Sequence, residues 1–255
     1  MKRLTVTNQK GGLGKTCIST NIARCLADDF NKRVLFIDFD VQANASETLK
    51  TFVSPCTCFD FISRELTDSE IQNFDTATNI VLLKSSIELA NSESFDNKCV
   101  SFFNTNIKKI ESLFDYMIMD TPPTLGNTLK LALLLSENLI TPLELDSFAL
   151  MGLNKLFSSF RALKQYNNNL NFLGIVINKF INQRKRQKEL FDEIKLKIGD
   201  NILFKSKIHA NCSIQDALSL SCSLKQLRKI KGYTNSRAIN EFYALTIEVL
   251  EKIEK

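Results

Sequence analysis

The sequence contains no tryptophan, four prolines and a single histidine in 255 residues. Because His209 is the only histidine, neither a histidine-based zinc site nor a Ser-His-Asp triad is expected. No apolar run reaches the ~18 residues that a membrane-spanning helix needs. Met1, Lys2 and Arg3 lead directly into an apolar segment without a signal peptide, so the sequence predicts a cytoplasmic protein with no membrane partner.

Cysteine pairs with metal-binding or redox spacing are also missing. The seven cysteines are scattered, and Cys56 and Cys58 form a lone C-x-C with no second half. This distribution is typical of reduced thiols in a cytosolic protein. The sequence therefore predicts neither a disulfide framework nor a cysteine metal site.

What the sequence does contain, close to its N-terminus, is a glycine-rich segment flanked by two lysines. It consists of Lys10, Gly11, Gly12, Leu13, Gly14, Lys15 and Thr16, between a strand-like run at 4–7 and a helical pattern from 16 to about 27. Glycines let backbone N–H groups approach phosphate oxygens, and the N-terminus of the following helix favours an anion. This arrangement predicts a nucleotide site in which Lys15 reaches the β- and γ-phosphates and the Thr16 hydroxyl binds magnesium.

Two continuous apolar runs, at 34–38 and 116–120, end in the carboxylates Asp38 and Asp120. Such runs are typical of parallel strands that are buried on both faces. Open α/β sheets bind their ligands at the carboxyl ends of the strands. Asp120 is therefore expected to support magnesium, and the segment after Asp38, which includes Asp40, is expected to face the ligand.

The remaining chain alternates strand-like and helical patterns. Further strands are expected at 79–83, 138–142, 171–178 and 201–204, and helices at 124–136, 148–166, 185–197 and 235–253, with short helices in 45–79 and one or two in 86–113. This alternation predicts one α/β domain, residues 1–255, in which helices cover both faces of a parallel sheet. The last helix has a largely acidic polar face, which favours docking against the core over attachment to anionic lipid.

Positive charge is concentrated in the C-terminal half of the chain. Residues 179–237 contain fourteen lysines and arginines against five aspartates and glutamates, although the net charge of the whole chain is only +5. This local excess predicts a polyanionic partner, with an ordinary solvated basic surface as the alternative.

Several ordered motifs resemble the ParA/Soj-type partition ATPases, members of the ParA/MinD family whose deviant phosphate loop carries a second lysine. The loop has this K-G-G-x-G-K-T form, with Gln9 where the usual P-loop has its first glycine. Four more segments resemble family motifs in the family's order: 21–23, 34–44, 116–126 and 147–153. The resemblance covers nearly the whole chain and implies a P-loop NTPase fold, a three-layer α/β/α arrangement with a mostly parallel, twisted sheet.

The same resemblance implies the roles of the site residues. Lys15 would bind phosphate in its own subunit, Lys10 would reach across a nucleotide-sandwich homodimer, and Asp40 would orient the attacking water. ATP and magnesium are the implied cofactors. The residues implied to support the metal are Thr16, Asp38 and Asp120. The implied nucleotide contacts are Lys10, Gly11, Gly12, Leu13, Gly14, Lys15, Thr16, Cys17 and Asn178.

For partners, the resemblance implies non-specific double-stranded DNA, held by the ATP-bound dimer, and a ParB-like centromere-binding protein that stimulates hydrolysis. The protein would then be a slow ATPase switch in plasmid or chromosome partition, cytoplasmic and associated with the nucleoid. Lysines and arginines without interleaved aromatics suit phosphate contacts. The candidate DNA contacts are Arg184, Lys185, Arg186, Lys188, Lys207, Lys225, Arg228, Lys229, Lys231 and Arg237.

Three positions depart from the family pattern. Val41 replaces a proline next to Asp40, His209 replaces a proline in the segment 208–211, and Cys17 replaces a common threonine beside the phosphates. One alternative is a MinD-like membrane-cycling ATPase, which would need a basic amphipathic tail. A second is an ATP-dependent metabolic ligase, for which no substrate constellation is recognisable. An iron–sulfur relative would need a second cysteine to partner Cys17.

Overall fold

The computed structural model describes residues 1–91, 97–124, 126–165, 167–230 and 236–254. Within them, eight strands form one sheet in the order β3-β4-β2-β5-β1-β6-β7-β8, and all neighbouring strands are parallel. The strands are β1 (Lys2–Val6), β2 (Val34–Asp38), β3 (Val53–Thr57), β4 (Ile80–Lys84), β5 (Tyr116–Asp120), β6 (Asn138–Glu144), β7 (Asn171–Phe180) and β8 (Leu203–His209). The first strand is therefore central, and its carboxyl end brings the glycine-rich loop to the sheet edge where β2 and β5 also end.

Helices separate most successive strands, as the alternating pattern predicts. The longer ones are α1 (Lys15–Asp29), α6 (Asn97–Ile110), α7 (Asn127–Leu134), α8 (Ala149–Lys164), α9 (Lys185–Ile198), α10 (Cys212–Ser219) and α12 (Ser236–Ile253). The shorter ones are α2 (Asn44–Thr48), α3 (Cys58–Ser63), α4 (Asp68–Gln72), α5 (Glu88–Asn91) and α11 (Leu224–Arg228), with 3-10 turns η1 (Lys50–Phe52), η2 (Glu111–Leu113) and η3 (Asp200–Ile202).

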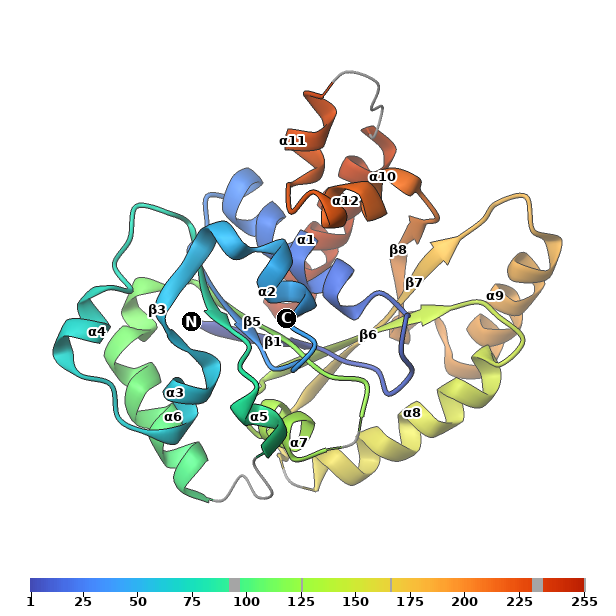
Figure 1. The fold of residues 1–255 in the computed structure, drawn as a ribbon. Coiled ribbons are helices and arrows are strands. Elements are labelled where there is room, and N and C mark those ends of the chain that lie inside the picture. The colour runs from blue at the N-terminus through green and yellow to red at the C-terminus, as the bar shows by residue number, and fades with distance from the viewer. Residues whose placement is uncertain (92–96, 125, 166, 231–235, 255) are drawn as a thin grey trace.

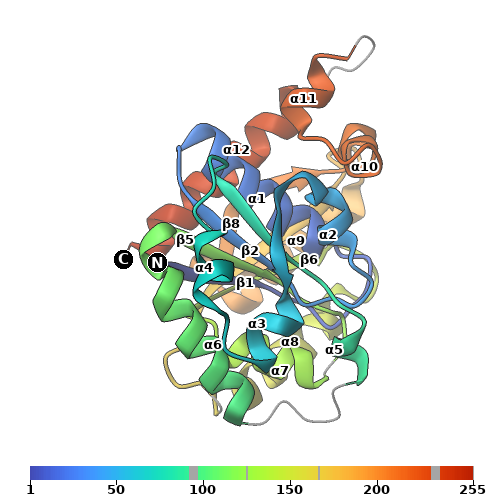
Figure 2. The same ribbon diagram turned by 60° about the vertical axis from the view of Figure 1, so that its left-hand side comes forward.

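Alternate side chains of the strands enter two different cores. In β2, Val34 and Phe36 belong to the apolar cluster of α1, whereas Leu35 and Ile37 belong to the cluster of α3 and α6. Helices α1, α2, α10, α11 and α12 therefore cover one face of the sheet, and α3, α6, α7, α8 and α9 cover the other (Figures 1 and 2). The predicted three-layer α/β/α fold with a parallel sheet is confirmed.

The last helix, α12, docks against the sheet as its composition predicts. Phe242 and Val249 are buried in the core. On the acidic face, the Glu248 carboxylate accepts hydrogen bonds from the backbone N–H groups of Lys205 (2.8 Å) and Ser206 (3.0 Å) in β8. These bonds satisfy donors that an edge strand otherwise leaves unpaired. Among the helices that the structure describes, none combines the length and apolar character needed to cross a bilayer.

Several predicted boundaries are wrong. The helix expected from 124 begins only at Asn127. The strand expected at 201–204 begins at Leu203 and runs on to His209, and the prediction missed this extension because the middle of the strand is polar. Strand β3 was not predicted, since its sequence V-S-P-C-T contains a proline, which is tolerated at sheet edges. Strand β7 continues two residues beyond its predicted end at Asn178. The last helix, expected from 235, is described from residue 236 onward.

Gly174 interrupts the regular register of β7. Its φ is +141°, and an added Cβ would lie 2.3 Å from the carbonyl oxygen of Ile202. The pairing with β6 shifts between Leu139 and Ile140, directly beside this residue. Only glycine tolerates both the backbone conformation and the close approach, so Gly174 determines how the carboxyl half of β7 is placed.

We expect Gly174→Ala to lower the free energy of unfolding by roughly 1–3 kcal/mol from backbone strain alone, with steric overlap adding to the loss. The matched control is Gly152→Ala in α8, where an added Cβ meets no atom within 4 Å and where alanine should stabilise the helix by about 0.5–1 kcal/mol. Urea unfolding followed by circular dichroism measures both variants. Equal stabilities would contradict this account of β7.

Candidate functional site

The glycine-rich loop joins the end of β1 to the first turn of α1. Gly12 and Gly14 have φ values of +74° and +88°, in the left-handed region that favours glycine. Gly14 is the N-cap residue of α1 and supplies no side-chain cap. The first backbone N–H groups of this 15-residue helix are therefore open toward a ligand, which is the arrangement that binds phosphate.

Asn178, at the far end of β7, packs directly against the loop. Its Nδ2 donates a hydrogen bond to the Leu13 carbonyl oxygen at 2.8 Å. A Cβ on residue 14 would lie 2.2 Å from the same nitrogen atom. Position 14 therefore requires glycine for two reasons, its φ angle and its contact with Asn178.

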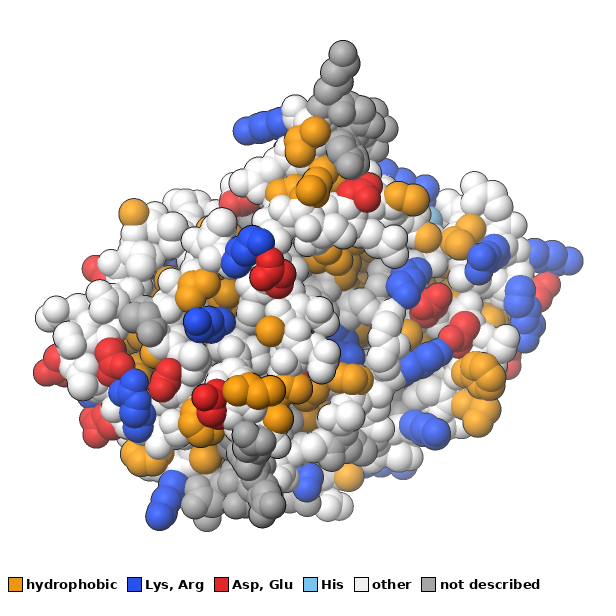
Figure 3. All heavy atoms as spheres, in the orientation of Figure 1, with side chains coloured by type: hydrophobic (Ala, Val, Ile, Leu, Met, Phe, Trp, Pro, Cys, Tyr) orange, Lys and Arg blue, Asp and Glu red, His pale blue; other side chains and the backbone are white. Residues whose placement is uncertain are grey.

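A cavity of about 530 Å³ opens in front of the loop. It is lined by the loop and the start of α1, by residues of the segment 40–48, by Pro123 and by the end of α10. This face of the molecule is hollowed beneath α10 (Figure 3). Burial lowers the pKa of the Lys15 ammonium, and the charges of Asp120 and Asp40 act in the opposite direction. A buried ammonium close to open N–H groups is suited to a triphosphate.

Behind Lys15, the parallel register places Asp38 of β2 beside Asp120 of β5, and both side chains are fully buried. The Thr16 hydroxyl donates to Asp120 Oδ2 at 2.6 Å and the Ser19 hydroxyl to Oδ1 at 3.1 Å. Burial, and then the negative charge of Asp38, raise the pKa of Asp120 above its usual value. Burial likewise raises the pKa of Asp38.

The two aspartates differ in what their oxygens contact. Asp38 Oδ1 accepts from the Asp40 N–H at 3.0 Å, and Oδ2 accepts from both the N–H and the hydroxyl of Ser46 at 2.7 Å. Asp38 therefore fixes the loop that follows β2. Asp120 instead contacts the hydroxyl of Thr16, which lines the cavity.

Thr16 and Asp120 form an oxygen donor pair of the kind that magnesium prefers. Within the described residues, no group of three or more His, Cys, Asp or Glu side chains could hold a metal ion. The residues present fit a magnesium ion that takes most of its ligands from phosphate oxygens and water.

Asp40 lies at the cavity wall in a loop closed by its own hydrogen bonds. Its Oδ1 accepts from the Gln42 N–H at 3.0 Å, and its carbonyl oxygen accepts from the Ala43 N–H at 2.8 Å. Ala43 has a φ of +56°, a conformation that a non-glycine residue seldom adopts. The loop therefore keeps these two hydrogen bonds although Val41 stands where the family has proline.

A second cavity of about 430 Å³ adjoins the first, and Gly12, Gly14, Cys17 and Leu218 line both. The rest of its lining comes from Asn178 and Lys179 and from the segment 209–215. A chamber beside the phosphate cavity has the position expected for the base of a nucleotide. Burial raises the pKa of the Cys17 thiol to about 12, so this side chain is neutral between the two chambers.

His209, where the family often has proline, is held by α12. The Glu241 carboxylate accepts from the His209 backbone N–H at 2.9 Å and contacts the ring Nδ1 at 2.7 Å. Proline has no N–H and could not make the first bond. The chain thus holds this side of the second cavity with hydrogen bonds in place of a rigid ring.

Lys10 lies apart from the phosphate cavity of its own subunit. Its ammonium pairs with the Asp146 carboxylate, which also accepts from the Phe148 N–H at 2.9 Å. Partial burial acts to raise the pKa of Asp146, but the hydrogen bonds from Lys10 and Phe148 outweigh it and lower the pKa. The Lys10 side chain is 49% exposed, at the rim of the loop.

The candidate DNA contacts do not form one patch. Arg184, Lys185, Arg186 and Lys188 lie at the start of α9, and Lys225, Arg228 and Lys229 lie in or directly after α11. The two helices occupy separate parts of the molecule in both ribbon views (Figures 1 and 2). The candidates on these two helices therefore lie on separate parts of the surface.

Several of these side chains are also engaged within the fold. Lys207 lies over the rings of Phe180 and Phe191, with its nitrogen 4.8 Å and 3.3 Å from the centroids, so an interleaved aromatic contact exists that the sequence did not predict. Lys225 pairs with Asp29, and Arg237 pairs with Glu241. Lys231 lies outside the described residues.

Sequence reasoning missed two residues that contact the loop. Lys179 donates from Nζ to the Gly12 carbonyl oxygen at 2.7 Å, and Asp146 pairs with Lys10. Lys179 directly follows Asn178 in the sequence, and Asp146 stands just before the family-like segment 147–153. Their neighbours provided a signal, but their contacts depend on the tertiary fold.

Comparison with known proteins agrees with this geometry. Residues 1–172 match the sequence model of a family described as AAA domain. The chain is 30% identical to the virulence plasmid ParA family protein pGP5-D of Chlamydia psittaci, with 99% of this chain and 96% of that protein covered. It is 31% identical to the protein IncC of Escherichia coli, with 100% and 70% covered. It is 29% identical to the sporulation initiation inhibitor protein Soj of Bacillus subtilis, with 86% and 88% covered.

Solved structures share the fold across the whole chain. A putative plasmid partition protein from Borrelia burgdorferi B31, bound to AMPPNP, superposes with a TM-score of 0.77 at 25% identity, with 98% of this chain and 99% of that chain covered. Cobyrinic acid a,c-diamide synthase from Mycobacterium smegmatis, with a bound ATP analog and magnesium, gives 0.77 at 19% identity, with 100% and 96% covered, a likeness of fold alone.

The family match spans more than half of the chain, and the ParA relatives extend over nearly all of it. The structure adds a loop, a helix N-terminus and a buried lysine arranged for a triphosphate. The chain belongs to the ParA family of partition ATPases.

Proposed function

We propose that the whole chain, residues 1–255, works as one ATPase domain that drives DNA segregation as a slow, nucleotide-controlled switch. ATP assembles two copies into a sandwich dimer, the dimer binds double-stranded DNA without sequence preference, and hydrolysis dissolves it. A ParB-like centromere-binding protein stimulates hydrolysis, and the protein acts in the cytoplasm on the nucleoid. Family membership and the two adjoining cavities beside the glycine-rich loop support this proposal.

In each subunit, the chain's own groups divide the work on the triphosphate. The open N–H groups of α1 and the Lys15 ammonium bind the phosphate oxygens, while Asp40, at the cavity wall, orients the attacking water. Thr16 and Asp120 hold the magnesium side of the site. Magnesium, when bound with ATP, neutralises charge on the β- and γ-phosphoryl oxygens.

The observation that carries the dimer proposal is the position of Lys10. The described lining of the phosphate cavity includes Gly11, Gly12 and Lys15 but not Lys10, whose ammonium lies outside on Asp146. A lysine that turns away from its own triphosphate is free to exchange Asp146 for a phosphate of a second subunit. The ion pair between Lys10 and Asp146 is partly exposed and contributes little stability, so breaking it to bind a phosphate costs little free energy.

For DNA, we propose that the exposed basic side chains at the start of α9 and in α11 provide two separate contact points. Arg184 and Lys188 on α9, and Arg228 and Lys229 around α11, are the exposed candidates whose described side chains have no ion pair. Two points of positive charge on each subunit would follow a DNA backbone through its phosphates.

We expect Lys15→Gln to weaken ATP binding by roughly 10-fold to 150-fold, because a charge-assisted hydrogen bond to phosphate is lost. Lys10→Gln should bind ATP about as tightly as the wild type but should fail to dimerise with it. Titration with a fluorescent ATP analogue measures affinity, and light scattering with chromatography measures mass. Unchanged affinity in Lys15→Gln, or an ATP dimer in Lys10→Gln, would contradict the assigned roles.

Asp40→Ala is expected to form the ATP dimer but to hydrolyse ATP at least about 100-fold more slowly, since water is no longer oriented. The control is Asp68→Ala, at an exposed position in the first turn of α4, a helix that lines neither of the two cavities. Phosphate release and dimer lifetime are measured on the same samples. Normal turnover in Asp40→Ala would remove Asp40 from the mechanism.

DNA binding is expected only with ATP and should fall steeply with salt, because each phosphate contact releases counterions. Co-sedimentation with DNA is measured with ATP, ADP or no nucleotide at two ionic strengths. The double variants Arg184→Ala/Lys188→Ala and Arg228→Ala/Lys229→Ala should each reduce the steepness of log affinity against log salt by about 2 for each subunit that contacts DNA. The control pair, Lys108→Ala/Lys130→Ala, replaces exposed lysines on α6 and α7, outside both candidate contact points. Binding that ignores nucleotide or salt would refute the DNA proposal.

A further inference from the structure

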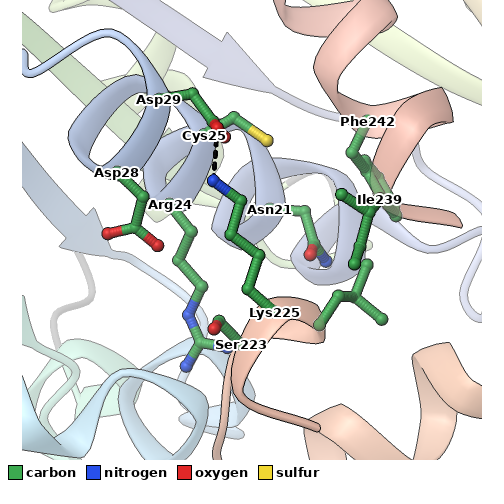
Figure 4. Close-up of a pocket in the computed structure, with 10 residues that line it drawn as sticks. Asn21, Arg24, Cys25, Asp28, Asp29, Ser223, Lys225, Ile239 and Phe242 are labelled. Atoms are coloured by element: carbon green, nitrogen blue, oxygen red, sulfur yellow. Dashed lines mark hydrogen bonds and ion pairs between the residues drawn. The ribbon is translucent and has the colours of Figure 1, made fainter. Parts of the chain in front are cut away.

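Arg24 is a buried arginine on α1 that neither the loop motif nor the catalytic proposal uses. It lies two turns beyond the phosphate loop on the same helix, and only 8% of the residue is exposed. Figure 4 shows its side chain extending from α1 toward Ser223, in the segment that precedes α11. Burial lowers the pKa of its guanidinium.

The guanidinium of Arg24 bridges two backbone carbonyl groups from distant parts of the chain. Nη2 donates to the carbonyl oxygen of Thr48 at 2.8 Å, and Nη1 donates to the carbonyl oxygen of Cys222. Within the described residues, no carboxylate lies within ion-pair distance of it. The buried charge is therefore satisfied by backbone dipoles, and Thr48 is the last residue of α2, where helix carbonyls carry partial negative charge.

The two carbonyl groups lead to two walls of the phosphate cavity. The α2 wall consists of Asn44, Glu47 and Thr48, and so includes one of the carbonyl groups. The α10 wall consists of Leu218 and Ser219, and Cys222 follows it by three residues. Cys222 is tied to the α10 wall because its N–H donates to the Ala217 carbonyl oxygen at 3.0 Å. Arg24 thus links the α2 wall to the segment that follows the α10 wall.

We propose that Arg24 is a positioning residue that couples occupancy of the phosphate cavity to the placement of α11. A nucleotide in the cavity meets both walls. Because one rigid, planar guanidinium holds both, a shift of the α2 wall is transmitted to Cys222 and so to α11, which begins two residues later. α11 carries Arg228 and is followed by Lys229, so DNA contact by α11 becomes dependent on the nucleotide.

A lysine could not replace Arg24 in this role. Its ammonium is a compact charge on a flexible stem, whereas the guanidinium presents two nitrogen atoms at a fixed separation. Arg24→Lys therefore keeps the charge but breaks the bridge. The matched control is Asp29→Asn on the same helix, which removes the neighbouring pair between Asp29 and Lys225 (Figure 4) and leaves the bridge intact.

Hydrogen exchange of the full-length protein, with and without ATP, tests the coupling directly. In the wild type and in Asp29→Asn, ATP should slow exchange in residues 44–49 and in residues 218–228 over the same ATP concentrations. In Arg24→Lys, ATP should still protect residues 44–49 but should no longer protect residues 222–228. Unchanged protection of 222–228 in Arg24→Lys would overturn the proposal.

Co-sedimentation with DNA supplies a second readout, the ratio of affinities with ATP and ADP, which would not change if Arg24 only stabilised the fold. The ratio of DNA affinity with ATP to that with ADP should be about tenfold lower in Arg24→Lys than in the wild type. This readout rests on the proposed DNA function, whereas the exchange experiment does not. Wild type without DNA binding but with coupled protection would refute only the DNA function.

If Arg24→Lys fails to fold, the hydrogen-exchange data of the wild type alone decide whether the two segments are coupled. Protection of the two segments at different ATP concentrations, or of one segment only, would refute the coupling. Protection of both segments at one common ATP concentration supports it.

Discussion

Two carboxylates, buried side by side on neighbouring strands, set the conditions that the rest of the site must meet. Asp38 and Asp120 are paired in the sheet register and have no access to solvent. Two negative charges cannot remain close together in such a place unless donors and cations surround them. The surrounding groups are the ones that define the site: Lys15, Thr16 and Ser19 on α1, and Ser46 on α2. The phosphate loop and the Asp40 loop are thereby fastened to the same pair of strands.

The two helical layers contribute unequally to this site. Helices α1, α2 and α10 form the walls of the phosphate cavity, and α12 fixes His209 beside the second one. The opposite layer supplies apolar clusters, and the segment between β6 and α8 supplies the Asp146 carboxylate that pairs with Lys10. The helices that line the phosphate cavity thus lie on one face of the sheet, while the other face mainly provides a packed support.

How much of this could be predicted from the sequence depended on whether the signal was local. The glycine-rich loop, β2 and β5 were predicted because their chemistry lies in consecutive residues, and Asp38, Asp40 and Asp120 were recognisable at the strand ends. Strand β3 and the true extent of β8 were not, because a proline and polar residues hide them in the pattern. The bridge from Arg24 joins residues far apart in sequence, and no local pattern predicts it.

The basic segment 179–237 also shows that closeness in the sequence does not predict closeness in the fold. The basic residues of 179–237 are close in the sequence, but β8 and α10 separate α9 from α11 along the chain, and the folded molecule keeps the two helices apart. Individual contacts, such as Lys207 over Phe191, depend on side chains that only the folded sheet brings together.

The strand order has a consequence for how the protein is made. β1 leaves the ribosome first, yet both of its partners, β5 and β6, are more than a hundred residues away. At about 5–20 residues per second, the phosphate loop must wait on the order of ten seconds of synthesis before the strand beneath it can pair. During that time the apolar strand has no partner and the nucleotide loop has no support, so nucleotide cannot assist the early steps of folding, and β1 lacks its second partner until residue 144 has been made.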